Sequence, residues 1–338
     1  MNKARITTGN LRIVLLIIAA AAAFIIIPAA GSDYILTVVD TVLIYFLGSI
    51  GISLLMGMGG HLSFATISFM GIGAFLAAQM SKNYGIAPVL AVPLAVIMTA
   101  AAALVIGLML LRLSGSFFLF ATIAFAQIMA NVFLTFRPLS NGADGVYNIP
   151  KLSFLGIEFN SLTKWFRLLM IIVVIVALIV ERIRRTVLGR SLMSVRDDEV
   201  AAKTFGVNVY RTKVIAFVIA NTFAALGGAL LAFHNGAVSA SLFTFEISQR
   251  FLVMVMLGGV NSTVGTLVGT FVVTMLPEWL RPVQMYLNIF FGAGLILMMV
   301  YMPMGLMGLL EDFVKRIRNR KSVNERKEQE DHADHAEN

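Results

Sequence analysis

Long apolar runs separated by short polar segments dominate the chain. The runs span about 11–31, 34–57, 61–80, 86–111, 117–136, 164–180, 214–234, 247–276 and 286–310. A helix needs ~20 apolar residues to cross the hydrocarbon core of a bilayer. The pattern therefore predicts an all-α polytopic membrane protein with about eight to ten transmembrane helices, broken or re-entrant segments included.

The composition agrees with this pattern and excludes a soluble domain. Of the 338 residues, 59% are hydrophobic and 13% are charged, and the mean hydropathy is +0.88. Soluble domains have about 25% charged residues. The absence of cysteine excludes disulfides, thiolate metal sites and cysteine nucleophiles. The net charge of +8 comes from basic residues beside apolar runs, which set orientation in a membrane and do not indicate nucleic acid.

Basic residues also predict the orientation. Lys3, Arg5 and Arg12 precede or open the first run, so residues 1–10 are expected in the cytoplasm. A cleaved signal peptide is the alternative, but the run is longer than the apolar region of such a peptide. Alternate crossings of the transmembrane permease region, 11–310, place the polar segment 137–163 outside and the basic segment 181–213 inside. The charged tail 311–338 is expected to be cytoplasmic and disordered, with both termini inside.

Two glycine-rich breaks interrupt the apolar runs, at 57–75 and 256–270. Both contain a glycine pair followed by a serine: Gly59, Gly60 and Ser63 in the first, and Gly258, Gly259 and Ser262 in the second. The second break lets 247–276 re-enter or cross twice, which keeps the basic tail inside. Paired breaks of this kind indicate a translocation path, so we predict that the two breaks lie near one another. Close packing between helices is the other interpretation of the small residues.

The basic segment 181–213 contains a predicted short helix, 196–206. Ser194 or Asp197 can cap its start, and Gly206 can end it in the left-handed conformation. We predict that this helix contacts an ATPase, since Ala201 and Ala202 allow another surface to approach. The predicted coupling residues are Arg196, Asp197, Asp198, Glu199, Ala201, Ala202 and Gly206.

The sequence contains none of the common motifs of enzyme active sites. There is no phosphate-binding loop, zinc-protease motif or nucleophile elbow, so we expect no catalytic residues, metal or cofactor. His332 and His335 fit a solvated tail better than a metal site. Asp40 lies within an apolar run, where a carboxylate suggests function. Pairing with a neighbouring helix or a place near the headgroups is the favoured interpretation for this single carboxylate.

Several blocks of sequence are similar to one family. Glu199, Ala201, Ala202 and Gly206 form an E-x-A-A-x-x-x-G pattern that resembles the EAA loop of bacterial ABC importer permeases. Blocks at 59–75, 112–128, 141–150, 189–220 and 256–273 resemble the branched-chain amino acid permeases. The resemblance covers roughly 35–310. It fits the LivM-type subunit better than its LivH-type partner.

The resemblance implies a permease in the bacterial inner membrane, in an ABC importer permease fold. Its expected partners are a LivH-type permease, two cytoplasmic ATPases that use the ATP, an extracytoplasmic solute-binding protein and the lipid bilayer. The implied cargo is leucine, isoleucine or valine. One alternative is the same importer class carrying urea, amides or another small polar solute. Another is a stand-alone channel or a secondary carrier in which Asp40 couples an ion.

Overall fold

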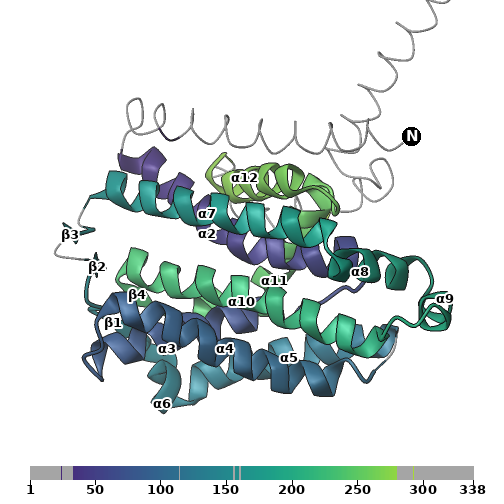
Figure 1. The fold of residues 1–338 in the computed structure, drawn as a ribbon. Helices are drawn as coiled ribbons and strands as arrows, with labels where there is room; N and C mark the ends of the chain where they lie inside the picture. The colour runs from purple at the N-terminus through teal and green to yellow at the C-terminus, as the bar shows by residue number, and fades with distance from the viewer. Residues whose placement is uncertain are drawn as a thin grey trace, which may run out of the picture.

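The computed structural model describes Phe24, residues 33–113, 115–154, 157–159 and 161–279, and Gly292. The predictions for 1–10, for the tail 311–338 and for the runs at 11–31 and 286–310 fall outside these residues, apart from Phe24 and Gly292. The described part is a helical bundle with two minimal β-ladders (Figure 1), which confirms the all-α fold class.

The helices follow the predicted apolar runs closely. They are α2 (Asp33–Ser53), α3 (Thr66–Lys82), α4 (Pro88–Leu110), α5 (Ser116–Thr135), α6 (Arg137–Ser140), α7 (Leu162–Arg185), α8 (Val187–Asp197), α9 (Glu199–Thr204), α10 (Val209–Asn235), α11 (Phe245–Gly258) and α12 (Thr263–Trp279). A π-helical turn η1 (Leu54–Met58) extends α2, and 3-10 turns η2 (Gly142–Asp144) and η3 (Ala240–Phe243) lie in connections. Among the described residues, α2 with η1, α4, α5 and α10 are long and apolar enough to cross a membrane.

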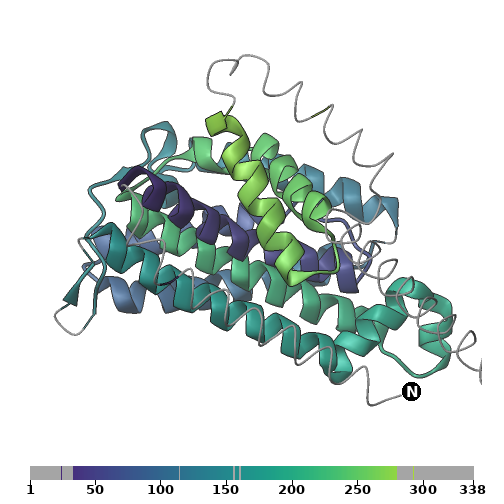
Figure 2. The same cartoon turned by 90° about the horizontal axis from the view of Figure 1, so that it is seen from above.

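Helix α10 lies at the centre of the bundle. It packs against α2, α3 and α4, and α7 covers α2 (Figures 1 and 2). Glycines permit the close contacts: a Cβ atom at Gly228 would lie 1.8 Å from the carbonyl oxygen of Met70 in α3. A Cβ atom at Gly51 in α2 would lie 2.4 Å from the carbonyl oxygen of Ala220 in α10. Because lipid provides little hydrophobic force between helices, such close backbone approach supplies much of their attraction.

The predicted broken segment 247–276 consists of two short helices. Helix α11 ends at Gly258, residues 259–262 turn the chain, and α12 runs back beside α11 (Figure 2). A Cβ atom at Gly258 would lie 1.9 Å from the carbonyl oxygen of Gly265, and one at Gly269 would lie 2.0 Å from that of Met254. At 14 residues, α11 is about 21 Å long, which is less than the ~30 Å hydrocarbon core. The break is therefore confirmed.

Asp40 pairs with a neighbouring helix, as the sequence suggested. Its fully buried carboxylate lies 3.2 Å from Nε2 of His234 in α10. The imidazole of His234 stacks on Trp165 of α7, with ring centroids 5.5 Å apart. The cluster joins α2, α7 and α10, three elements far apart in the chain.

The two predicted polar segments lie at opposite ends of the bundle. Helices α8 and α9 are at the right end in Figure 1, and strands β1 (Val146–Tyr147), β2 (Ser153–Phe154) and β3 (Ile157–Glu158) are at the left end. Strand β1 pairs antiparallel with β4 (Ala237–Val238), and β2 pairs with β3. Within the segment at 181–213, α7 continues to Arg185 and α10 begins at Val209, so the connection between these two helices is 186–208.

This arrangement predicts opposite labelling of two engineered cysteines in the naturally cysteine-free chain. Ala143 is exposed at the strand end, and Val187 is 70% exposed at the α8 end. In intact cells a membrane-impermeant thiol reagent should label Ala143→Cys and not Val187→Cys, because the basic end stays in the cytoplasm. Both variants should label after permeabilisation. If only Val187→Cys is labelled in intact cells, the orientation of the chain in the membrane is opposite to the predicted one. Ser140 is unsuitable as a probe because it is fully buried.

Candidate functional site

The two glycine breaks meet at the α8 end of the bundle. The hydroxyl of Ser53, at the end of α2, donates to the carbonyl oxygen of Val260 at 2.9 Å. A Cβ atom at Gly57 would lie 2.2 Å from the same carbonyl oxygen. The prediction that 57–75 and 256–270 lie near one another is therefore confirmed. The π-helical turn Leu54–Met58 widens α2 at this contact, as such turns often do at functional sites.

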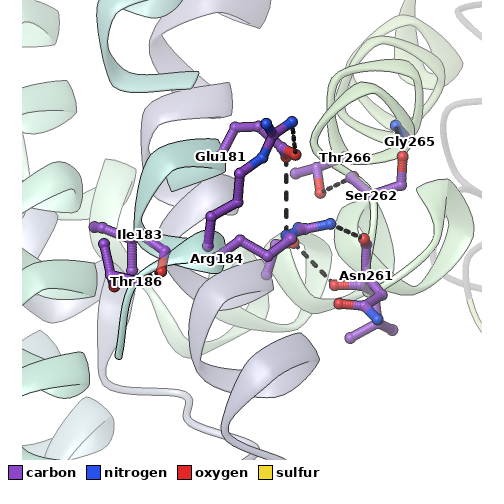
Figure 3. Close-up of polar contacts among 11 residues, drawn as sticks. Glu181, Ile183, Arg184, Thr186, Asn261, Ser262, Gly265 and Thr266 are labelled. Carbon is purple, nitrogen blue, oxygen red and sulfur yellow. Dashed lines mark hydrogen bonds and ion pairs between the residues drawn. The ribbon is translucent and has the colours of Figure 1, made fainter. Parts of the chain in front are cut away.

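Two arginines hold the backbone of the breaks. Arg196 of α8 donates from Nη1 to the carbonyl oxygen of Gly57 at 2.6 Å. Arg184, in the last turn of α7, donates to the carbonyl oxygen of Asn261 and also pairs with Glu181 (Figure 3). Hydrogen bonds from a charged donor are about twice as strong as neutral ones. Each break is thus tied to the segment that contains the predicted coupling helix.

Glycine conformation fits these contacts. Gly60 has φ +68°, and a Cβ atom there would lie 2.6 Å from Cγ of Arg196. Gly259 has φ +110°, which ends α11 in a conformation that L side chains rarely adopt. Ser262 accepts a hydrogen bond on its hydroxyl oxygen from the backbone N–H of Gly265 at 3.1 Å, which satisfies a free donor at the start of α12 (Figure 3).

The remaining break residues, Gly59, Gly258 and Ser63, are placed by local packing. Gly59 ends the π-helical turn, with its N–H bonded to the carbonyl oxygen of Leu55. Gly258 packs against α12, and Ser63 is buried before α3 begins. A path role for the six break residues stays a prediction. Of these six residues, Gly60 packs against the side chain of Arg196.

The coupling helix starts later than predicted. Arg196 and Asp197 end α8, and α9 begins only at Glu199. Asp198 separates the two helices in an extended conformation and accepts from the N–H groups of Val200 at 2.8 Å and Ala201 at 3.0 Å. The prediction that Ser194 or Asp197 caps this helix is therefore wrong. The carboxylate of Asp198 accepts from the free N–H groups at the start of α9 instead. Gly206 has φ +81°, which confirms its left-handed conformation after the helix.

The exposed surface of α9 also differs from the prediction. Ala202 is buried against Val195 and Val209, so its small size serves packing within the chain and the prediction of an open alanine surface is wrong there. Val200 and Phe205 are 74% and 87% exposed instead. We call these two side chains and the α9 helix the coupling surface. Large exposed apolar side chains at a polar end of the chain indicate a contact with another protein.

Comparison with known proteins identifies the family. A model of the permease component of branched-chain amino acid transport systems matches residues 34–300. The chain belongs to this family of permeases. It is 29% identical over 301 residues to the high-affinity branched-chain amino acid transport system permease protein LivM of Salmonella typhimurium, covering 82% of this chain and 71% of that protein. LivM of Escherichia coli K12 is 28% identical with the same coverage.

A more distant relative is a probable branched-chain amino acid transport permease protein LivH of Methanocaldococcus jannaschii. It is 24% identical over 245 residues, 69% of this chain and 74% of that protein. No solved structure matches the chain. The resemblance to the LivM-type permeases is confirmed, and so is the prediction of a membrane protein. As a transport component of an ABC importer family, the permease works with ATPase and binding-protein partners in general.

An ion pair joins the permease's coupling helix to its central helix. Glu199 of α9 accepts from Nζ of Lys213 in α10 at 2.7 Å, and the Lys213 side chain is only 9% exposed. This hydrogen bond lowers the pKa of Glu199, because it favours the ionised carboxylate. The sequence alone does not identify Lys213 as the partner of Glu199. The 14-residue separation crosses a helix break, so no helical periodicity relates the two positions.

We predict that exchanging the two charges of this ion pair restores most of the stability and ATP hydrolysis that reversing one charge removes. Glu199→Lys leaves the buried Lys213 cation facing a like charge, so transport-coupled ATP hydrolysis and thermal stability should fall. Removing one partner of a buried pair costs about 3–5 kcal/mol; the partial exposure of Glu199 places this pair below that range. Glu199→Lys combined with Lys213→Glu should recover most of the loss. A double variant no better than the worse single variant would contradict a pairwise role.

The lowered pKa also gives the pH dependence of the ion pair. Its contribution is fully present above the ordinary pKa of glutamate and is lost as the pH falls through the lowered value. The stability difference between wild type and Lys213→Met should therefore shrink on acidification in this range and stay constant at neutral pH.

Proposed function

We propose that this permease is the transmembrane subunit of an ABC importer that passes leucine, isoleucine or valine from a solute-binding protein to the cytoplasm. The observation that carries the proposal is the coupling surface, in which Val200 of α9 and Phe205 directly after it are largely exposed. The names of the LivM relatives support the cargo. Two ATPases and a LivH-type permease complete the proposed complex in the bacterial inner membrane, with both termini cytoplasmic.

The contacts of the coupling segment support a mechanical route. Closure of the ATPase pair would push α9, which Glu199 ties to α10 through Lys213. Arg196 and Arg184 would carry the same displacement to the breaks at Gly57 and Asn261. Since α10 packs against α2, α3 and α4, its movement changes the position of these helices together. The path would then switch from outward-open to inward-open.

The buried Asp40 supports this proposal over an ion-coupled carrier. Its carboxylate is fully buried and paired with His234, and ion coupling requires a group that an ion can reach from solution. ATP hydrolysis in partner subunits supplies the energy instead. Selectivity can reside in the binding protein, so the permease needs no tight substrate site.

The first prediction of this proposal concerns docking. Phe205→Ser and Val200→Ser should reduce co-purification of the ATPase, since apolar anchors at interfaces contribute about 2 kcal/mol or more each, about thirtyfold in Kd. Val187→Ser is the matched control, because Val187 is 70% exposed and lies outside α9. Gly206→Val should act like the α9 variants by straining the end of the helix. Equal ATPase recovery from all variants would remove the docking assignment.

The second prediction concerns cargo and energy. Proteoliposomes with both permeases, the ATPases and the binding protein should accumulate leucine only when ATP is present on the ATPase side. This chain alone should give no uptake. Uptake by the chain alone would establish a carrier or channel. ATP-driven uptake of urea or amides without leucine would keep the importer class and replace the cargo.

A further inference from the structure

Helix α5 exposes polar side chains along part of one face. Only 22% of its span is buried, against 72% for α10. The exposed side chains recur at helical spacing along one face: Phe117, Phe120, Ala124, Gln127, Ile128, Asn131, Leu134 and Thr135. The half of this face nearest the strand end therefore carries two amides and a hydroxyl beside Ile128 and Leu134.

Helix α4 provides an internal comparison. It is nearly as exposed, with 28% of its span buried, but its exposed residues are all apolar: Leu90, Pro93, Leu94, Ile97, Met98, Ala101, Leu104, Val105, Leu108 and Met109. The hydroxyl of Thr99 in α4 is buried and donates to the carbonyl oxygen of Ala95 at 2.7 Å. This face suits lipid. Within α5, Asn131 donates from Nδ2 to the carbonyl oxygen of Gln127 at 2.9 Å, and the hydroxyl of Thr135 donates to that of Asn131 at 2.8 Å. The Gln127 amide and the amide oxygen of Asn131 still have an unfavourable transfer free energy from water to lipid, so this part of α5 favours a polar environment.

A non-helical segment lies beside the same stretch of α5. Residues 236–244, between α10 and α11, include only β4 and the 3-10 turn η3. The ring of Phe243 lies 5.7 Å from that of Phe75 in α3 and 5.9 Å from that of Phe133 in α5. Phe75 lies in the middle of α3 and Phe133 lies in the last turn of α5, so η3 packs against the strand end of α5.

The first residues of α11 continue along α5. The ring of Phe245 lies 5.5 Å from that of Phe64, whose backbone N–H donates to the hydroxyl of Thr122 in α5 at 3.3 Å. The start of α11 therefore passes α5 between Thr122 and Phe133, the stretch that contains Gln127. Glu246 and Gln249 are exposed in these first turns of α11.

We propose that Gln127, Asn131 and Thr135 of α5, with Glu246 and Gln249 of α11, line the aqueous translocation path. Polar side chains are exposed on both α5 and α11, beside the non-helical segment that precedes α11. Such groups are more favourable in water than in lipid. The α5–α11 face, as we call these five residues, contains none of the six glycine-break residues.

The chemistry of the α5–α11 face suits a zwitterion, an assignment that rests on the proposed function. Amide groups both donate and accept hydrogen bonds, so Gln127 and Asn131 can contact the carboxylate and the ammonium group in turn. Glu246 attracts the ammonium group. Toward the α8 end the same face of α5 continues as Phe117 and Phe120, which offer apolar contact to the side chain of a branched amino acid.

Thiol reactivity in the assembled importer tests the lining directly. Gln127→Cys and Asn131→Cys are compared with Ile97→Cys and Leu104→Cys on the lipid-facing side of α4, all in reconstituted complexes purified with their partner subunits. A charged, water-soluble methanethiosulfonate reacts with the thiolate, which forms in water and not in lipid. The α5 cysteines should react at least about tenfold faster than the α4 cysteines. Leucine-loaded binding protein with ATP should slow the reaction.

The outcomes separate the lining from the cargo. Rates at Gln127→Cys and Asn131→Cys equal to the α4 rates would overturn the proposal. Loss of the partner permease in both α5 variants would also overturn it, because amides that only pack two helices together are needed for assembly. Fast reaction that another solute slows and leucine does not would support the lining and reject the proposed cargo.

Discussion

Backbone carbonyl groups that helix breaks release need hydrogen-bond partners, and this requirement organises the inner end of the permease. An unsatisfied buried carbonyl costs about 1–3 kcal/mol. Gly57 and Asn261 lie at the two breaks, more than 200 residues apart in the chain, and each carbonyl accepts from an arginine of the α7–α8 region. Val260 accepts from Ser53. The breaks therefore cannot shift without the segment that presents α9.

The position of α10 makes local contacts at α9 relevant to the whole bundle. Its Lys213 holds Glu199 at one end, and its His234 holds Asp40 at the other. Between these points Gly228 allows backbone contact with α3. Contacts of this closeness leave no flexible side chain to absorb a displacement. A push on α9 therefore acts on a tightly packed unit of helices.

The motif residues of the coupling loop act mainly within the chain. Glu199 pairs with Lys213, Ala202 packs against Val195 and Val209, and Gly206 follows the helix in the left-handed conformation. The side chains offered to a partner are Val200 and Phe205, which occupy variable positions of the motif. In this permease the motif builds a rigid short helix, and the residues between and beside the motif positions form its outer surface.

The sequence by itself determined the helical class, the limits of most helices to within a few residues and the existence of both breaks. These features depend on local properties: apolar length, glycine conformation and the cost of polar backbone in a membrane. It also placed Gly206 correctly, since a left-handed residue after a short helix is a local requirement. The exposed amides at Gln127 and Asn131 were visible in the sequence, but nothing local distinguished them from polar residues packed between helices.

Tertiary structure alone decided which side chains meet. The cap at Asp198, the burial of Ala202 and the ion pair of Glu199 with Lys213 depend on how α8, α9 and α10 fold back on one another. The contacts of Arg184 and Arg196 with the two breaks join residues 77 and 139 positions apart. No periodicity relates such positions, because they become neighbours only when glycine-mediated packing brings the helices together.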